Sequence, residues 1–195
     1  MKTLKFNLFI ATILALSVQS CMRSVSRVDP EKEIDISGRW NDVDSKITAE
    51  SMIDQVLGEI WLKKHMNEKK EKPVIIVGFV KNKSHEHIDA ETFIKDVEKS
   101  FITSQKVRLV QGGEKRDAVR GERADQQDNS SVSNMKKWGL EVGADYMMQG
   151  SINSIVDALD RKKVVYYQID LELTNMETNE IVWIGDKKIK KFVKN

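Results

Sequence analysis

The sequence VVYYQIDLELT, residues 164–174, is followed after a short connection by EIVWIGDKKIKKF, residues 180–192. Apolar and polar side chains alternate in both stretches, and the apolar positions of this pattern are Ile169, Leu171, Leu173, Ile181 and Trp183. A period of two residues indicates strands with one buried face. The end of the chain is therefore predicted to be an antiparallel β-hairpin joined by residues 175–179.

Upstream of this hairpin, the sequence predicts alternating helices and strands. Residues 48–64 carry the apolar spacing of a helix with one buried stripe, which Asp44 or Ser45 can cap. The apolar run VIIVGFV, residues 74–80, is typical of a strand covered on both faces. We further predict a helix over 88–102 capped by Asp89, a strand at 107–110, an exposed helix or mobile excursion over 114–128, a helix over 131–142 and a strand over 146–156. This order predicts one α+β domain over residues 34–195, with helices packed on a mixed, mainly antiparallel sheet that ends in the hairpin.

The distribution of charge argues against nucleic acid as a partner. The 195 residues contain 32 basic and 30 acidic side chains, but Lys2 and Lys5 lie in a first stretch of 20 residues without any acidic residue. Basic and acidic side chains are therefore balanced in the rest of the chain. Proteins whose main task is to bind DNA or RNA carry a clustered positive excess instead.

The beginning of the chain has the pattern of an export signal. Two lysines precede the apolar stretch 6–18, which at about 13 residues is too short to span a bilayer. This stretch ends in Val18-Gln19-Ser20-Cys21, which is similar to a bacterial lipobox. We expect residues 1–20 to be a signal peptide and Cys21, the only cysteine, to be acylated. An ordinary signal peptide followed by a free thiol, or a chance apolar N-terminus, is the alternative.

Residues 21–33 are predicted to form the lipidated cysteine and a short flexible tether. Residues 22–33 are polar and show no hydrophobic period, and they contain Pro30. A fully extended chain of this length reaches at most about 40 Å. The domain is therefore expected to work close to its membrane. Met22 follows the cysteine in place of an aspartate, which favours an outer-membrane anchor facing the periplasm.

No sequence pattern predicts catalysis. The chain has no G-x-S-x-G elbow and no phosphate-binding glycine loop, and one cysteine cannot form an intrachain disulfide or a thiolate cluster. His85 and His87 could bind a metal, but two ligands without a third favour solvated side chains. Asp42, Asp44 and Glu50 could supply acid–base carboxylates, but their place at a helix start favours turn and cap roles. We therefore expect no enzymatic activity, no cofactor and no metal.

Two features are candidates for binding a partner. Lysines crowd the last stretch, and Lys187, Lys188 and Lys190 could attract an anionic lipid, a cell-wall polymer or an acidic protein surface. The alternative is that these lysines protect an edge strand from aggregation. Arg39 and Trp40 are residue types enriched in interface hot spots, although Trp40 could equally be a lid on the first helix.

Four stretches together carry a family resemblance: DISGRWNDVDS (35–45), PVIIVGFVKN (73–82), GADYMMQGSI (143–152) and LELTNMETNEIVWIGDKKIKK (171–191). In this order and after a lipobox, they are similar to the LpoB-type activators of penicillin-binding proteins. Related periplasmic domains, the TolB amino-terminal and CsgG-like ones, share parts of the pattern such as the last hairpin.

The resemblance implies an outer-membrane lipoprotein without an active site. It would bind an accessory domain of a bifunctional, class A penicillin-binding protein and stimulate peptidoglycan synthesis. Through this synthesis it would contribute to cell wall biogenesis and cell shape. We expect a monomer. The alternative is a structural or assembly lipoprotein of an envelope complex, of the CsgG-like or flagellum-associated kind.

Overall fold

The predicted C-terminal hairpin is present in the computed structural model, which describes residues 25–29, 32–129 and 141–194. Strand β4 (Lys162–Asn175) pairs antiparallel with β5 (Ile181–Lys194) on one side and with β3 (Tyr146–Leu159) on the other. The predicted signal peptide, Cys21 and almost all of the predicted helix 131–142 lie outside the described residues. The chain divides into two units, Met1–Glu33 and Ile34–Asn195.

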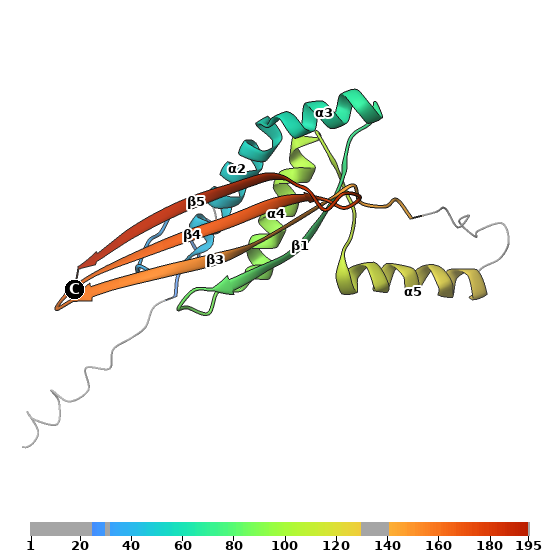
Figure 1. Ribbon diagram of the computed structural model, residues 1–195. Helices are drawn as coiled ribbons and strands as arrows, with labels where there is room; N and C mark the ends of the chain where they lie inside the picture. Colours follow the sequence, from blue (N-terminus) through green and yellow to red (C-terminus); the bar gives the residue numbers. More distant parts are fainter. Residues whose placement is uncertain (1–24, 30–31, 130–140, 195) are drawn as a thin grey trace, which may run out of the picture. The chain divides into compact units, whose positions relative to one another are not determined.

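Two further strands make the sheet mixed. Strand β1 (Val74–Lys83) runs parallel to β3 and also to β2 (Arg108–Leu109), and the strand order is β2-β1-β3-β4-β5. The α+β class with a mixed sheet is thus confirmed (Figure 1). A bulge between Val77 and Val80 shifts the register of β1 against β3. Phe79 lies in this bulge and is 53% exposed, so the prediction that both faces of 74–80 are covered was wrong at this end.

Helices α2 (Asp42–Gly58) and α4 (Ala90–Ser104) pack against each other and cover one face of the sheet (Figure 1). The single helix predicted over 48–64 is divided in two, because Glu59 has an extended backbone and α3 (Ile60–Lys69) begins after it. This break allows the indole Nε1 of Trp61 to donate to the carbonyl of Val56 at 2.6 Å. One carbonyl at the end of α2 is thereby satisfied.

The cap of α2 lies earlier than predicted. Asn41 is the N-cap residue, and its side chain accepts from the backbone N–H of Asp44 at 3.0 Å. Asp44 in turn accepts from the backbone N–H of Asn41 at 3.0 Å, which completes a capping box. The predicted cap at Asp44 or Ser45 was therefore wrong in position, while Asp89 caps α4 as predicted.

Replacing Asn41 by alanine is expected to lower the free energy of unfolding by about 1 kcal/mol, because one orphan N–H of α2 loses its acceptor. Urea unfolding followed by far-UV circular dichroism measures this loss. Asn67→Ala, an exposed change inside α3, is the control. Equal midpoints for the two variants would contradict the capping role of Asn41.

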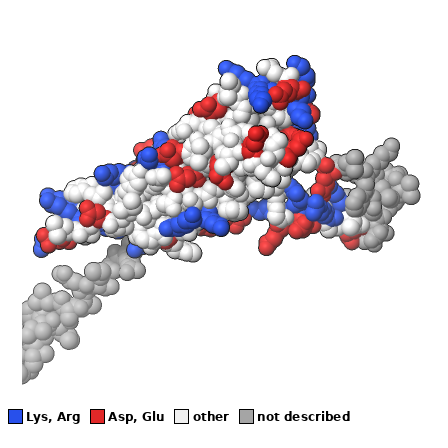
Figure 2. Space-filling model, in the orientation of Figure 1, with Lys and Arg blue, Asp and Glu red and all other residues white. Residues whose placement is uncertain are grey.

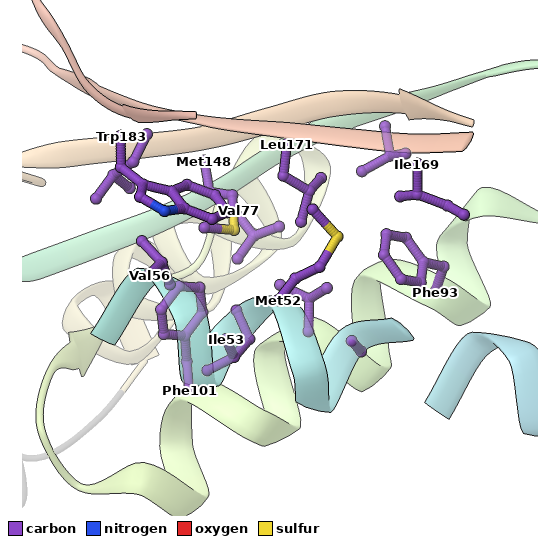
Figure 3. Packing of buried hydrophobic residues seen from close by; sticks show 14 of the residues in the cluster. Met52, Ile53, Val56, Val77, Phe93, Phe101, Met148, Ile169, Leu171 and Trp183 are labelled. Carbon is purple, nitrogen blue, oxygen red and sulfur yellow. The ribbon is translucent and has the colours of Figure 1, made fainter. Parts of the chain in front are cut away.

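The hydrophobic core lies between the two helices and the sheet, and all of its members belong to the unit Ile34–Asn195. Figure 3 shows α2 contributing side chains that point between the sheet and α4, with the labelled members Met52, Ile53, Val56, Val77, Phe93, Phe101, Met148, Ile169, Leu171 and Trp183. Ile181 was predicted to be buried but is 55% exposed. A register shift between Leu173 and Thr174 pairs Leu173 with Trp183 and Thr174 with Ile181, which breaks the alternation there.

Helix α5 (Gly113–Asn129) lies on the surface, as the polar sequence of residues 114–128 predicts. It is connected to its surroundings by ion pairs: Lys115 with Glu91 of α4 at 2.9 Å, and Arg120 with Glu141 at 2.9 Å. The Arg120 guanidinium, through its hydrogen bonds, lowers the pKa of Glu141. Exposed pairs of this kind contribute little to stability.

Candidate partner-binding surface

Of the histidines and acidic residues considered for chemistry, His85 and Asp44 have structural partners, whereas His87, Asp42 and Glu50 are exposed. His85 Nδ1 lies 2.6 Å from the hydroxyl of Ser154, and its Nε2 lies 3.2 Å from a carboxylate oxygen of Glu86. Asp44 belongs to the capping box of α2. Within the described ranges, no group of three or more His, Cys, Asp or Glu residues is placed to hold a metal.

The sheet divides the lysine-rich strand β5 into two faces. Burial alternates along β5, so Lys187 and Lys191 face the helices while Lys188 and Lys190 face away. The ammonium of Lys187 donates to the hydroxyl of Ser51 on α2 at 3.2 Å. The predicted cluster therefore does not act as one patch. Lys187 is occupied within the fold, and Lys188 and Lys190 remain on the opposite surface.

Lys191 is the centre of a largely buried ion-pair group. Its ammonium lies 2.6 Å from the Asp44 carboxylate and 2.7 Å from that of Asp35, and it donates to the carbonyl of Arg39 at 3.1 Å. The side chains of Lys191 and Asp44 are only 11% and 9% exposed. Burial acts to lower the pKa of Lys191, but the hydrogen bonds to Asp35 and Asp44 outweigh it and the pKa is raised.

Arg39 and Trp40 belong to a segment that leads into α2, residues 34–41, which we call the lead-in segment. Arg39 is exposed, whereas Trp40 is half-buried and packs edge-on against Phe93 and Tyr167, with ring centroids 6.4 Å and 5.6 Å away. The backbone N–H of Trp40 donates to Glu86 at 3.1 Å. Trp40 thus lies in the position of a lid over the core.

The lead-in segment is also held by Tyr167. The phenol of this buried side chain on β4 donates to the carbonyl of Gly38 at 3.1 Å. Burial, together with the neighbouring Glu86 carboxylate, raises the pKa of Tyr167. The hydroxyl therefore stays protonated and remains a donor at physiological pH.

The face of β3, β4 and β5 opposite to the helices is accessible, and we call it the open face. Its centre is polar: Asn153 and Gln168 both donate to Asp170, at 2.9 Å and 2.8 Å. Gln149 donates to Glu172 at 2.8 Å. These groups bind one another within β4 and between β3 and β4, so the centre of the open face is a rigid polar platform.

Lysines border this platform on two sides. Lys81 and Lys83 of β1 lie opposite Ser151 and Asn153 of β3, and Lys188 of β5 lies opposite Gln168 of β4. Lys188 forms an ion pair with Asp186 at 3.1 Å, and this hydrogen bond raises the pKa of Lys188. In Figure 2, basic and acidic side chains are interspersed over the face in view, so this face has no single sign of charge.

A pocket of about 270 Å³ lies on the open face, next to the exposed Ile184 and Phe79. Lys81 contributes to its wall, and its ammonium lies 5.0 Å from the centre of the Phe79 ring. Exposed aromatic and aliphatic side chains are suited to the centre of a protein interface, with charged residues at its rim. Sequence reasoning missed these β1 residues, although the alternation Phe79, Lys81, Lys83 is a signal that could have indicated them.

Comparison with known proteins identifies the class of the chain. The family model of the peptidoglycan-synthase activator LpoB matches residues 44–189. The chain therefore belongs to the LpoB family, and the resemblance noted in the sequence is confirmed. A search of curated protein sequences gives no significant match.

Two solved structures of LpoB domains and one of another lipoprotein are similar to the chain. The LpoB C-terminal domain from Escherichia coli has 18% sequence identity and a TM-score of 0.46, covering 76% of this chain and 99% of that one. The domain from Salmonella enterica has 16% identity, the same TM-score and the same coverage. The lipoprotein GNA1162 from Neisseria meningitidis has 12% identity and a TM-score of 0.40, covering 63% of this chain and 84% of that one.

Proposed function

We propose that this chain is an envelope lipoprotein that binds a class A penicillin-binding protein and stimulates its glycan polymerisation and peptide cross-linking. The observation that carries the proposal is the match of the activator family over residues 44–189. The chain itself acts without catalysis. This agrees with the structural roles that His85 and Asp44 have in the fold.

The second part of the proposal is a lipid anchor. Cys21 becomes the first residue after removal of the signal peptide, and acyl chains such as palmitate hold it in the outer membrane, facing the periplasm. The described part of the chain contains no helix long and apolar enough to cross a membrane. Several acyl chains together provide stable attachment where one chain binds only marginally.

We assign to the synthase the part of the open face that holds the polar platform, from Phe79 and Ile184 to the row of Lys83 and Lys188. It combines a rigid polar platform, apolar side chains at Phe79 and Ile184, and lysines on both borders. Of the residues considered from the sequence, Lys188 lies on this part of the open face and Lys190 lies on the same face one row further along, while Lys187 and Trp40 are engaged within the fold. Arg39 is exposed on the lead-in segment, at a separate place.

Activation follows from a difference in affinity. A partner that binds the active conformation of a synthase more tightly than the inactive one raises the population of the active state. The size of the effect cannot exceed that difference in binding free energy. A rigid platform is suited to this task because it loses little conformational entropy on binding.

The test uses residues 21–195, which include the whole core, with a purified class A synthase from the same cell. We expect the chain to raise the rate of glycan polymerisation in a saturable manner. Lys83→Glu combined with Lys188→Glu is expected to raise the half-saturating concentration roughly tenfold, because both charges border the same face.

The matched control is Lys63→Glu combined with Lys64→Glu, which makes the same charge change on exposed lysines of α3. We expect this control to stimulate like the wild type. A wild-type chain that neither binds nor stimulates the synthase would refute the function. Equal loss in both double variants would refute only the assignment of the open face.

A further inference from the structure

The strands β3, β4 and β5 end in an exposed apolar surface. On the open face, the last three cross-strand rows are Ile155–Tyr166–Lys190, Asp157–Val164–Phe192 and Leu159–Lys162–Lys194. We call these nine residues the ribbon end. Ile155 is 67% exposed, Leu159 75% and Phe192 63%, which is unusual for three large apolar side chains on one small surface.

Basic side chains surround these apolar residues. Lys162, Lys190 and Lys194 lie on the same face, and Arg161 lies in the turn between β3 and β4. Asp157 and Asp160 are the acidic residues in this neighbourhood, so cations predominate. Exposed leucine and phenylalanine beside lysine and arginine form the combination that binds the interface of anionic membranes.

The chain enters the domain beside the ribbon end. Asp35 of the lead-in segment is paired with Lys191, and a Cβ added to Gly38 would lie 2.3 Å from Val193. Lys191 and Val193 are the immediate neighbours of Phe192 on β5. The start of the domain, residue 34, is therefore held at this end of the sheet.

The length of chain before residue 34 limits how far the ribbon end can lie from an anchor. Twelve residues separate Cys21 from residue 34, and a flexible chain of this length spans on average roughly 20 Å. Such a tether confines the attached surface to an effective concentration in the millimolar range. At such a concentration, a contact between the ribbon end and the membrane would be well populated even if it were too weak to hold an untethered protein there.

We propose that the ribbon end binds the anionic lipid surface of the membrane that carries the anchor. Leu159 and Phe192 insert between headgroups, and Lys162, Lys190, Lys194 and Arg161 lie against lipid phosphates. The inference rests on the proposed anchoring at Cys21. It gives the tethered domain a fixed orientation, with Phe79 and Ile184, toward the other end of the open face, left accessible to a synthase.

The test installs the anchor chemically. Residues 21–195 are coupled through Cys21, the only thiol, to maleimide lipid in vesicles of phosphatidylethanolamine and phosphatidylglycerol. Amide hydrogen exchange is then measured by mass spectrometry. Peptides covering 155–166 and 188–194 are expected to exchange at least roughly threefold more slowly in the coupled protein than in the uncoupled protein. Vesicles of phosphatidylcholine alone, or high salt, are expected to weaken this protection.

Leu159→Ser combined with Phe192→Ser is expected to abolish the protection, whereas Ile60→Ser, at an exposed isoleucine of α3, leaves it unchanged. Exchange rates that do not differ between coupled and uncoupled protein would overturn the proposal. Protection that appears without lipid at high protein concentration would assign the surface to a second copy. Protection that requires the synthase would assign it to that partner, and either result also overturns the proposal.

The result can be separated from the proposed function. Coupling through maleimide does not depend on whether the cell acylates Cys21, and stimulation of the synthase is measured with the uncoupled chain. The Leu159/Phe192 double variant is expected to stimulate a synthase in solution like the wild type. Loss of lipid contact with retained stimulation would thus reject this inference alone.

Discussion

Replacing Lys191 by alanine is expected to lower the free energy of unfolding by about 3 kcal/mol. The change removes the cation that lies between Asp44 and Asp35 and leaves the Asp44 carboxylate, only 9% exposed, without a cationic partner. It also removes a donor from the carbonyl of Arg39. Urea unfolding followed by tryptophan fluorescence measures the loss.

Lys188→Ala is the matched control, because Lys188 lies on the same strand but on the open face. It is expected to leave the unfolding midpoint unchanged. A midpoint for Lys191→Ala that equals the one for Lys188→Ala would show that the Lys191 group does not contribute to stability.

The pH dependence of this group follows from its pKa directions. The raised pKa of Lys191 gives a contribution that is complete below the ordinary value of 10.5 and is lost as the pH rises through the higher folded value. The hydrogen bond from Lys191 lowers the pKa of the exposed Asp35, whose contribution is present above 3.8 and is lost as the pH falls through the lower folded value. The group is therefore intact across the neutral range.

Replacing Gly150 by alanine is expected to lower the free energy of unfolding by about 3 kcal/mol or more. Gly150 of β3 pairs with Leu171 of β4, and an added Cβ would lie 2.1 Å from the backbone oxygen of Asp170. A backbone oxygen within a strand ladder cannot move aside without breaking its pairing. Urea unfolding and the yield of soluble protein both measure the effect.

Gly121→Ala is the control for this substitution. The position lies inside α5, and an added Cβ would meet no atom within 4 Å. Alanine also favours a helix over glycine, so no loss of stability is expected. If Gly150→Ala unfolded at the same urea concentration as Gly121→Ala, the close approach of β3 and β4 would be of no energetic consequence.

Much of the fold could be predicted because the spacing of apolar side chains along the sequence indicates which residues are buried. The alternation of Ile169, Leu171 and Leu173 predicted one buried face of β4, and these residues are buried. The spacing of Met52, Ile53 and Val56 predicted the core stripe of α2. The break at Glu59 could not be predicted in the same way. The apolar spacing continues through Trp61, although α2 ends before Glu59 and α3 begins after it.

The candidate surface was less predictable because it depends on which face each residue occupies. Counting every second residue from Trp183 along β5 reaches Lys187 and Lys191, so the division of the lysines could have been derived from the sequence. The Asp44 partner of Lys191 could not, since it lies at the other end of the domain sequence. The bulge that exposes Phe79 likewise depends on pairing with β3.

The lead-in segment has a mechanical consequence for an anchored protein. A pull on the chain before residue 34 would load Asp35–Lys191 first, then the hydrogen bond from Tyr167 to Gly38, and only afterwards the core. Peeling residues 34–39 away from the sheet, up to the packed Trp40, would lengthen the connection by roughly 20 Å. Helix α2 would remain packed and capped, because its capping box begins at Asn41. Under load, the segment would therefore add length to the tether before the domain itself unfolds.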